Sequence, residues 1–335
     1  MAAEYQPSDW RVADYQTFCL DPSILDPATS RPLYIRGPRP PDLEPGSYFV
    51  CLGAAQTFGR FCRDPYPSLL SHRLNLPVLN ISRGGAGPSF FLGDGNTRLS
   101  ELINGARFVV VQVMSGRSES NSLFLSRGIG HYERRSDGRQ IGCDEAYDEL
   151  LASCSQEQAK RIIEETRQSW TTSYCSLLAG IQVPKILFWF AVRKPAYDEG
   201  WTTEDDQRLG GNWRNRETLF GGYPQLVNDT MVSDISRHAD GYVECVSRRG
   251  MPQKLTDRFT GKRVIVTDEW STQPWTKNWY YPSPQMHEDA ADVLAEQIRG
   301  LLSGKRAESQ RWKLGRLATR LSRHLTRRGA VAPRP

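Results

Sequence analysis

The sequence lacks long apolar runs, and its cysteines form no paired motif. No stretch of about eighteen apolar residues occurs, so we predict no transmembrane helix. The seven cysteines are scattered without a Cys-x-x-Cys pair, which argues against a zinc ribbon or a disulfide framework. The first residues lack the basic and apolar regions of a signal peptide. We therefore expect a cytoplasmic protein with reduced thiols.

Histidine is also scarce, because the chain has only five. The one grouping with a metal-binding character is His131, which is followed by Cys143 and Asp144. A helix-surface or loop histidine is the simpler reading of that grouping. We predict neither a metal nor a cofactor.

Positive charge is concentrated at the C-terminal end. The whole chain has 43 basic and 38 acidic residues, a net charge of +5. Residues 304–335 alone carry a net +9, so the rest carries about −4 and is not expected to bind nucleic acid. The basic residues of this tail are Lys305, Arg306, Arg311, Lys313, Arg316, Arg320, Arg323, Arg327, Arg328 and Arg334.

Leucines at helical spacing run through this tail, from Leu314 to Leu325. A basic amphipathic helix is typical of segments that bind an anionic membrane surface; a solvated or disordered end is the alternative. We expect full-length protein to sediment with anionic vesicles, less so in high salt, because each basic residue contributes about 1 kcal/mol near an anionic leaflet. A chain ending at residue 303 should stay in the supernatant. Equal sedimentation of both proteins would contradict a membrane role for the tail.

The rest of the chain alternates strand-like and helix-like stretches. Apolar, β-favouring runs predict strands, and apolar residues at helical spacing predict helices. The expected strands are 48–52, 77–81, 106–114, 186–192, 241–246 and 262–267. The expected helices are 57–74, 89–104, 156–179, 224–239 and 284–302. This alternation indicates an α/β protein with a parallel sheet and helices on both faces, in three layers.

The expected domain organisation has three parts. Residues 1–45 form an N-terminal arm with one short edge strand, 46–303 form the α/β domain, and 304–335 form the tail. Two stretches are expected to be insertions: 126–145, which is polar and irregular, and 196–222, which forms a long loop.

Three loops rich in glycine or polar residues follow the first three expected strands of this domain. They are 53–59 (Gly-Ala-Ala-Gln-Thr-Phe-Gly), 82–88 (Ser-Arg-Gly-Gly-Ala-Gly-Pro) and 115–121 (Ser-Gly-Arg-Ser-Glu-Ser-Asn). Sites in α/β proteins gather beyond the carboxyl ends of parallel strands. The turn after the first strand is therefore the expected centre of a site.

These loops resemble the motif blocks of the SGNH (GDSL-type) hydrolases, which have a flavodoxin-like α/β fold. The first block of that superfamily reads Gly-Asp-Ser-x-Thr-x-Gly, and residues 53–59 keep its glycines and threonine. The resemblance implies an oxyanion-hole glycine at Gly84 or Gly85. Three stretches of the chain, 56–61, 84–88 and 112–118, are also similar to uncharacterised bacterial proteins encoded with surface-polysaccharide and sulfotransferase functions.

The chain departs from the superfamily where the chemistry lies. Ala55 stands in the frame of the nucleophilic serine, the third block reads Ser-Gly-Arg-Ser at 115–118, and the block before the last helix, at 280–284, keeps only its proline, Pro284. A serine hydrolase needs a hydroxyl nucleophile within reach of its base. The standard Ser-His apparatus is therefore not expected.

Candidate site residues follow from these positions. An arginine in such a loop suits a carboxylate, sulfate or phosphate, and glycine-rich loops offer backbone N–H groups to an anion. The candidates for chemistry are Ser115, Ser118 and His287. The candidates for ligand binding are Ala55, Gln56, Thr57, Arg60, Arg83, Gly84, Gly85, Arg117 and Asn121. Helix caps, tight turns and solvated arginines are the simpler reading for several of them.

Two functions remain open at this point. The chain is either an enzyme, a hydrolase or transferase with a non-standard site acting on a carbohydrate or its anionic substituent, or a non-catalytic pseudoenzyme that binds a carbohydrate or a partner. Loss of the nucleophile favours binding, whereas the clustered polar residues at three strand ends favour chemistry.

Overall fold

The computed structural model describes residues 7–27, 29–92, 97–201, 213–267 and 274–302. The basic tail lies outside this range. Residue contacts divide the chain into two units, Met1–Val293 and Leu294–Pro335, and the sheet and candidate site belong to the first. Among the described helices, none is long and apolar enough to cross a bilayer.

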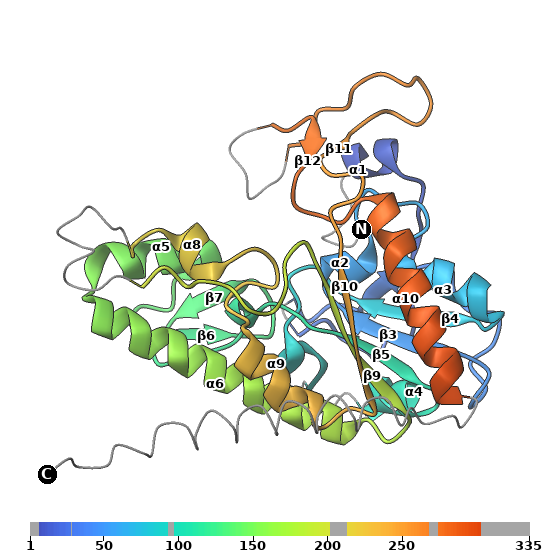
Figure 1. Ribbon diagram of the computed structural model, residues 1–335, viewed down its shortest axis with the longest axis horizontal. Coiled ribbons are helices and arrows are strands. Elements are labelled where there is room, and N and C mark those ends of the chain that lie inside the picture. Colours follow the sequence, from blue (N-terminus) through green and yellow to red (C-terminus); the bar gives the residue numbers. More distant parts are fainter. Residues whose placement is uncertain (1–6, 28, 93–96, 202–212, 268–273, 303–335) are drawn as a thin grey trace, which may run out of the picture. The chain divides into compact units, whose positions relative to one another are not determined.

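The main feature of the first unit is a seven-stranded sheet with the order β1-β2-β4-β3-β5-β9-β10 (Figure 1). Its strands are β1 (Thr17–Cys19), β2 (Tyr34–Arg36), β3 (Phe49–Gly53), β4 (Val78–Ser82), β5 (Val109–Gln112), β9 (Lys185–Ala191) and β10 (Gly241–Val246). Two small sheets pair β6 (Phe124–Ser126), β7 (His131–Arg134) and β8 (Gln140–Gly142), and β11 (Gln253–Lys254) with β12 (Lys277–Asn278).

The helices connect and cover these strands. They are α1 (Pro7–Val12), α2 (Ala55–Phe58), α3 (Tyr66–Leu74), α4 (Thr97–Asn104), α5 (Cys143–Ser153), α6 (Gln156–Gly180), α8 (Arg216–Phe220), α9 (Asp229–Ser236) and α10 (Pro284–Leu302), with short 3-10 turns η1 (Pro88–Leu92) and η2 (Gly116–Ser118).

The five central strands are all parallel. β3 pairs with β4 and β5, β5 with β9, and β9 with β10. Numbered along the chain, these strands have the spatial order 2-1-3-4-5 of flavodoxin-like folds. The predicted three-layer α/β fold class is confirmed. In such sheets ligands bind where the strand order reverses, which here is the edge between the ends of β3 and β5.

Helices pack on both faces of this sheet. On one face, apolar residues of β3, β5 and β9 form a common core with α4, α6 and α9, in which Trp170 and Tyr174 of α6 are fully buried. On the other face, Tyr66 of α3 packs against Phe188 and Phe190 of β9. Strands buried on both faces explain the nearly continuous apolar runs in the sequence.

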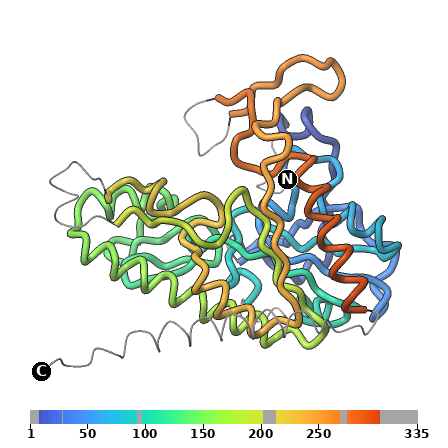
Figure 2. Tube along the Cα trace, viewed as in Figure 1, coloured from blue at the N-terminus to red at the C-terminus, as the bar shows by residue number. Residues whose placement is uncertain are grey.

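Strand pairing and side-chain contacts hold the N-terminal arm on the domain. β2 pairs antiparallel with β4, and this adds β1 and β2 to the sheet. Helix α1 lies beside the segment that contains β11, as the adjoining blue and orange tubes of Figure 2 show. There Arg11 pairs with Asp257, and Arg258 donates to the carbonyl of Trp10. The predicted arm boundary at residue 45 stays a prediction.

The predicted elements differ from the structure in several places, among them the helix expected over 224–239, which covers only Asp229–Ser236, and the loop expected over 196–222, which contains α8. The helix expected over 57–74 is split into α2 and α3, because Gly59 is left-handed (φ 77°) and ends α2. The helix expected over 89–104 becomes η1 and α4. The stretch 126–145 is not irregular, since it holds β7, β8 and the start of α5. The strand expected over 262–267 makes only isolated bridges, at Arg263 and Val266.

Candidate functional site

The turn after β3 begins the candidate site. Gly53 ends the strand, Ala54 is the N-cap of α2, and Ala55 is its first residue. Gly53 is paired with Ser82 at the end of β4, and its carbonyl accepts from the N–H of Arg83 at 3.1 Å. The first and second loops therefore meet at one edge, as the motif order predicted. Ala55 brings no hydroxyl to this edge.

A chain of buried hydrogen bonds lies directly under this turn. Gln112, the last residue of β5, accepts through Oε1 from the N–H of Ala54 at 3.0 Å and from Thr57 Oγ1 at 2.5 Å. Thr57 Oγ1 also lies 3.0 Å from the hydroxyl of Tyr66, and Gln112 Nε2 donates to the hydroxyl of Tyr223 at 2.9 Å. Thr57 therefore anchors the turn, and its hydroxyl is fully occupied.

Gln56 and Arg60 follow on the same short helix. Gln56 is 2% exposed, and among the described residues its Oε1 has no hydrogen-bond partner. Arg60 forms a two-bond ion pair with Asp9 of the arm and donates to the hydroxyl of Tyr281 at 3.0 Å. These contacts give Arg60 a structural role in holding the arm. A ligand role for either residue stays a prediction.

The second loop contains an ion-paired arginine, and its backbone packs closely against the segment between β6 and β7. Arg83 pairs with Asp26 of the arm at 2.9 Å and donates to the carbonyl of Gly84 at 3.0 Å. Gly85 has a φ of 73°, and a Cβ there would lie 3.0 Å from the backbone nitrogen of Gly130. Only glycine fits both conditions without strain. The loop thereby comes against the strand pair β6–β7.

The third loop places Arg117 at the end of β5. Ser115 caps η2 by accepting from the N–H of Arg117 at 3.4 Å. Arg117 is mostly buried and ion-paired with Asp144, which also pairs with Arg216 at 3.3 Å. The hydroxyl of Ser118 donates to the carbonyl of Gly85 at 2.8 Å, which ties the second loop to the third. Arg117 therefore joins the strand ends, with part of its charge balanced by Asp144.

His131 of β7 joins this group. Burial lowers the pKa of His131, and the positive charges of Arg83 and Arg117 lower it further. The backbone of this region meets both loops: Tyr132, the next residue, donates its hydroxyl to the carbonyl of Arg117 at 2.6 Å, and Gly130, the residue before, lies against Gly85. The second loop, the third loop and the start of β7 thus meet at one edge of the sheet.

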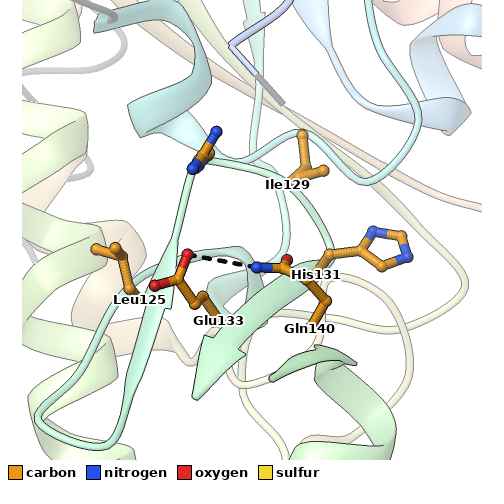
Figure 3. A pocket seen from close by; sticks show the side chains of 6 residues that line it. Leu125, Ile129, His131, Glu133 and Gln140 are labelled. Carbon is orange, nitrogen blue, oxygen red and sulfur yellow. Dashed lines mark hydrogen bonds between the residues drawn. The ribbon is translucent and has the colours of Figure 1, made fainter. Parts of the chain in front are cut away.

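A hollow of about 300 Å³ adjoins His131. Its lining is mixed, with apolar and hydrogen-bonding side chains: Leu125, Arg127, Ile129, His131, Glu133 and Gln140. Figure 3 shows five of these labelled side chains and the bond from Gln140 Nε2 to Glu133 Oε2, which measures 3.3 Å. The volume is at the small end of ligand pockets. It suits a small polar molecule.

Two predicted residues lie away from this group. Asn121 is occupied: its Nδ2 donates to Thr166 Oγ1 and its Oδ1 accepts from two backbone N–H groups. His287 is fully buried on the other face of the sheet, where its Nδ1 accepts from the N–H of Tyr66 at 3.1 Å and its ring packs on Phe190. Burial, together with Arg36, lowers the pKa of His287 to about 3.

No Ser-His pair forms from the predicted chemical residues. Within the described part of the chain, neither Ser115 nor Ser118 makes a hydrogen bond to His287, and each hydroxyl faces a backbone carbonyl. The same part of the chain holds no group of three His, Cys, Asp or Glu side chains suited to a metal ion.

One protein family matches most of the chain. It is described as a domain of unknown function (DUF6473), and it covers residues 23–127 and 149–302. The chain belongs to this family. The gap in the match, 128–148, overlaps the stretch that the sequence marks as an insertion.

Several solved structures resemble this DUF6473 chain at low identity. An acetyl xylan esterase (Est2A) from Butyrivibrio proteoclasticus is 11% identical, with 81% of this chain and 67% of that chain covered and a TM-score of 0.40. A family two carbohydrate esterase from Clostridium thermocellum in complex with cellohexaose is 11% identical, covering 81% and 68%, with a TM-score of 0.35. A candidate SGNH hydrolase from Slackia heliotrinireducens is 15% identical, covering 76% and 99%, with a TM-score of 0.31. None of the curated proteins matches.

Sequence reasoning missed several polar side chains of this DUF6473 chain near the strand ends. Gln112 could have been found, because it is a polar residue that closes an apolar strand. Tyr223, Gln225 and Tyr280 lie far along the chain and gave no local signal. Gln225 Nε2 donates to the hydroxyl of Tyr280 at 3.0 Å, and its carbonyl accepts from the N–H of Gly116 at 2.8 Å.

Glu119 is a further buried carboxyl just after η2. It is 2% exposed and accepts from the N–H of Ser89 and from Ser173 Oγ, both at 3.0 Å. Burial raises its pKa to about 7, against the opposing effect of these two donors. Since both oxygens are engaged between η1 and α6, Glu119 connects these elements and does not face the edge.

Proposed function

We propose that the chain binds a small carbohydrate that carries an anionic substituent, at the edge formed by the ends of β3, β4 and β5. It does so without a Ser-His hydrolytic pair. The observation that carries the proposal is the position of Arg117: it stands at the reversal of strand order, in a loop that hydrogen-bonds both the second loop, through Ser118, and β7, through Tyr132. An arginine fork in a mostly buried setting favours carboxylate, sulfate or phosphate groups.

The hollow beside His131 supports a carbohydrate as the larger part of the ligand. Its lining alternates apolar side chains with Glu133 and Gln140, which can bond sugar hydroxyls. The similarity of residues 56–61, 84–88 and 112–118 to bacterial proteins encoded with surface-polysaccharide functions also supports a carbohydrate. The alanine at position 55 and the engaged hydroxyls of Ser115 and Ser118 support binding over ester hydrolysis.

Arg117→Lys is the direct test of the anion site. Lysine keeps the charge but loses the planar fork, and a hydrogen bond to a charged group contributes roughly 1.5–3 kcal/mol. We expect the dissociation constant for a sulfated, phosphorylated or carboxylated monosaccharide, measured by calorimetry, to rise about tenfold or more.

Arg107→Lys is the matched control, because Arg107 is exposed and precedes β5 at the opposite edge of the sheet. Its affinity should equal that of wild type. Failure of wild type to bind any of these sugars at millimolar concentration would refute the proposed function. Unchanged binding by Arg117→Lys would remove Arg117 from the site.

A further inference from the structure

The hydroxyl of Tyr223 accepts one hydrogen bond, and its own hydrogen has no acceptor among the described residues. Gln112 Oε1 accepts from the backbone N–H of Ala54, which can only donate. The other end of the same amide must therefore be the NH₂ group, and it donates to the Tyr223 hydroxyl at 2.9 Å. Tyr223 is only 8% exposed, and within the described residues no acceptor bonds its O–H. A buried donor without an acceptor is costly unless a ligand completes it.

Tyr280, beside Tyr223, also has a hydroxyl that accepts from a glutamine amide. Its hydroxyl accepts from Gln225 Nε2 at 3.0 Å, and the two tyrosine rings meet edge to face with centroids 6.3 Å apart. Tyr280 is 40% exposed, so this second hydroxyl is accessible from solvent. Gln225 Oε1 is buried and, among the described residues, has no partner. The pair of tyrosines thus offers one outer and one inner donor.

The loop that carries Tyr223 and Gln225 lies against the residue before Arg117, because the carbonyl of Gln225 accepts from the N–H of Gly116 at 2.8 Å. Burial raises the pKa of Tyr223 well above its usual range, Tyr280 adds to this effect, and the nearby charge of Arg117 acts in the opposite direction. The phenol stays protonated and remains a donor. A guanidinium and two hydroxyl donors therefore converge on one region.

The loop that carries Tyr223 and Gln225 is held rigidly. Arg193 Nη2 donates to the carbonyls of Pro224 at 2.6 Å and Val227 at 2.8 Å. Arg167 Nε donates to the carbonyl of Leu226 at 3.0 Å, and Leu226 has a left-handed φ of 64°. Such a conformation in a bulky residue persists only where the surroundings fix it, and it is common at ligand sites.

We infer that Tyr223 and Tyr280 donate their hydroxyl hydrogens to the anionic group that Arg117 binds, and that this group is a sulfate or phosphate monoester. The inference rests on the proposed function. A guanidinium and two hydroxyls together can bond three oxygens. A sulfate or phosphate ester presents three terminal oxygens, whereas a carboxylate presents two.

The test compares glucose 6-sulfate, glucose 6-phosphate and glucuronate with wild type and three tyrosine variants. We expect wild type to bind one of the two esters at least about fivefold more tightly than glucuronate. Tyr223→Phe and Tyr280→Phe should each weaken ester binding by about fivefold and leave glucuronate within about twofold. Tyr242→Phe is the control, because its hydroxyl bonds Glu244 on β10 and should not affect either affinity.

The outcomes separate the two proposals. Arg117→Lys could weaken the binding of every ligand while the tyrosine variants keep the preference for the ester. That result would support the anion site and refute this inference. If wild type binds none of the three sugars, both fall. Should Tyr223→Phe fail to fold, the exposed Tyr280→Phe decides alone, since a purely structural role would not change the ratio of ester to carboxylate affinity.

Discussion

Replacing Arg36 by methionine should lower the free energy of unfolding by about 3–5 kcal/mol. Arg36 is 2% exposed and lies on β2 of the N-terminal arm. Its two terminal nitrogens donate to four backbone carbonyls at the end of α2 and in the turn that follows it, those of Phe58, Gly59, Cys62 and Arg63, at 2.8–3.3 Å. Methionine fills similar space and leaves these carbonyls without their donor, which costs far more than a typical surface substitution.

The same side chain also supports the candidate site. The guanidinium of Arg36 stacks on Tyr15 at 4.3 Å and on Phe58 at 5.4 Å. Phe58 is the last residue of α2, whose first residue is Ala55. Loss of Arg36 should therefore loosen the turn after β3 as well as the arm.

Thermal and urea unfolding measure this effect. The loss should appear as a fall of roughly 10 °C in the unfolding midpoint. Arg63→Met is the control: the Arg63 side chain is 80% exposed, and its removal should change stability by less than about 0.5 kcal/mol. Arg36→Lys should recover only part of the loss, because one ammonium cannot reach four carbonyls. A methionine variant within about 1 kcal/mol of wild type would contradict the assignment.

The sequence predicted the central sheet well because its strands are buried on both faces. Apolar runs such as Phe49–Gly53 and Lys185–Ala191 leave little choice of structure. Helix α10 begins and ends at the predicted residues, since Pro284 marks its start. The three-stranded sheet of β6, β7 and β8 was missed because each strand buries essentially one apolar side chain, and this gives a weak alternating pattern.

The sequence indicated the position of the candidate site better than it indicated which side chains are available there. The loops that carry Gly85 and Arg117 do lie side by side, because topology alone brings parallel strand ends together. The sequence could not show that Arg60 and Arg83 pair with Asp9 and Asp26 of the arm, since these ion pairs join distant segments. Nor could it show that His287 faces the opposite side of the sheet.

Stability should depend on pH through two buried groups with opposite effects. His287, with its pKa lowered to about 3, stays neutral in the native state while the unfolded chain binds a proton below its ordinary pKa of 6.5. Its contribution is complete above pH 6.5 and is lost as the pH falls toward 3. Glu119, with its pKa raised from 4.5 to about 7, keeps a proton that the unfolded chain releases. Its contribution is complete below pH 4.5 and is lost as the pH rises through 7.

Between pH 4.5 and 6.5 the two effects oppose each other, each at about 1.4 kcal/mol per pH unit. Wild type should therefore show little net slope from this pair, and single variants should reveal each part. Glu119→Gln can keep both hydrogen bonds of the carboxyl, and its stability should rise by about 2 kcal/mol from pH 5 to 6.5. His287→Asn keeps an acceptor for the Tyr66 N–H, and its stability should fall by a similar amount over the same interval.

Urea unfolding at pH 5, 5.75, 6.5 and 8 measures how the free energy of unfolding changes with pH. A loss of stability that does not depend on pH, such as one caused by the cavity in His287→Asn, shifts the whole profile and leaves its slope unchanged. At pH 8 wild type must ionise the buried Glu119, so Glu119→Gln should be the more stable of the two proteins. The variants should diverge in opposite directions from wild type. Parallel pH profiles for all three proteins would contradict this prediction. They would mean that neither His287 nor Glu119 remains uncharged in the folded state.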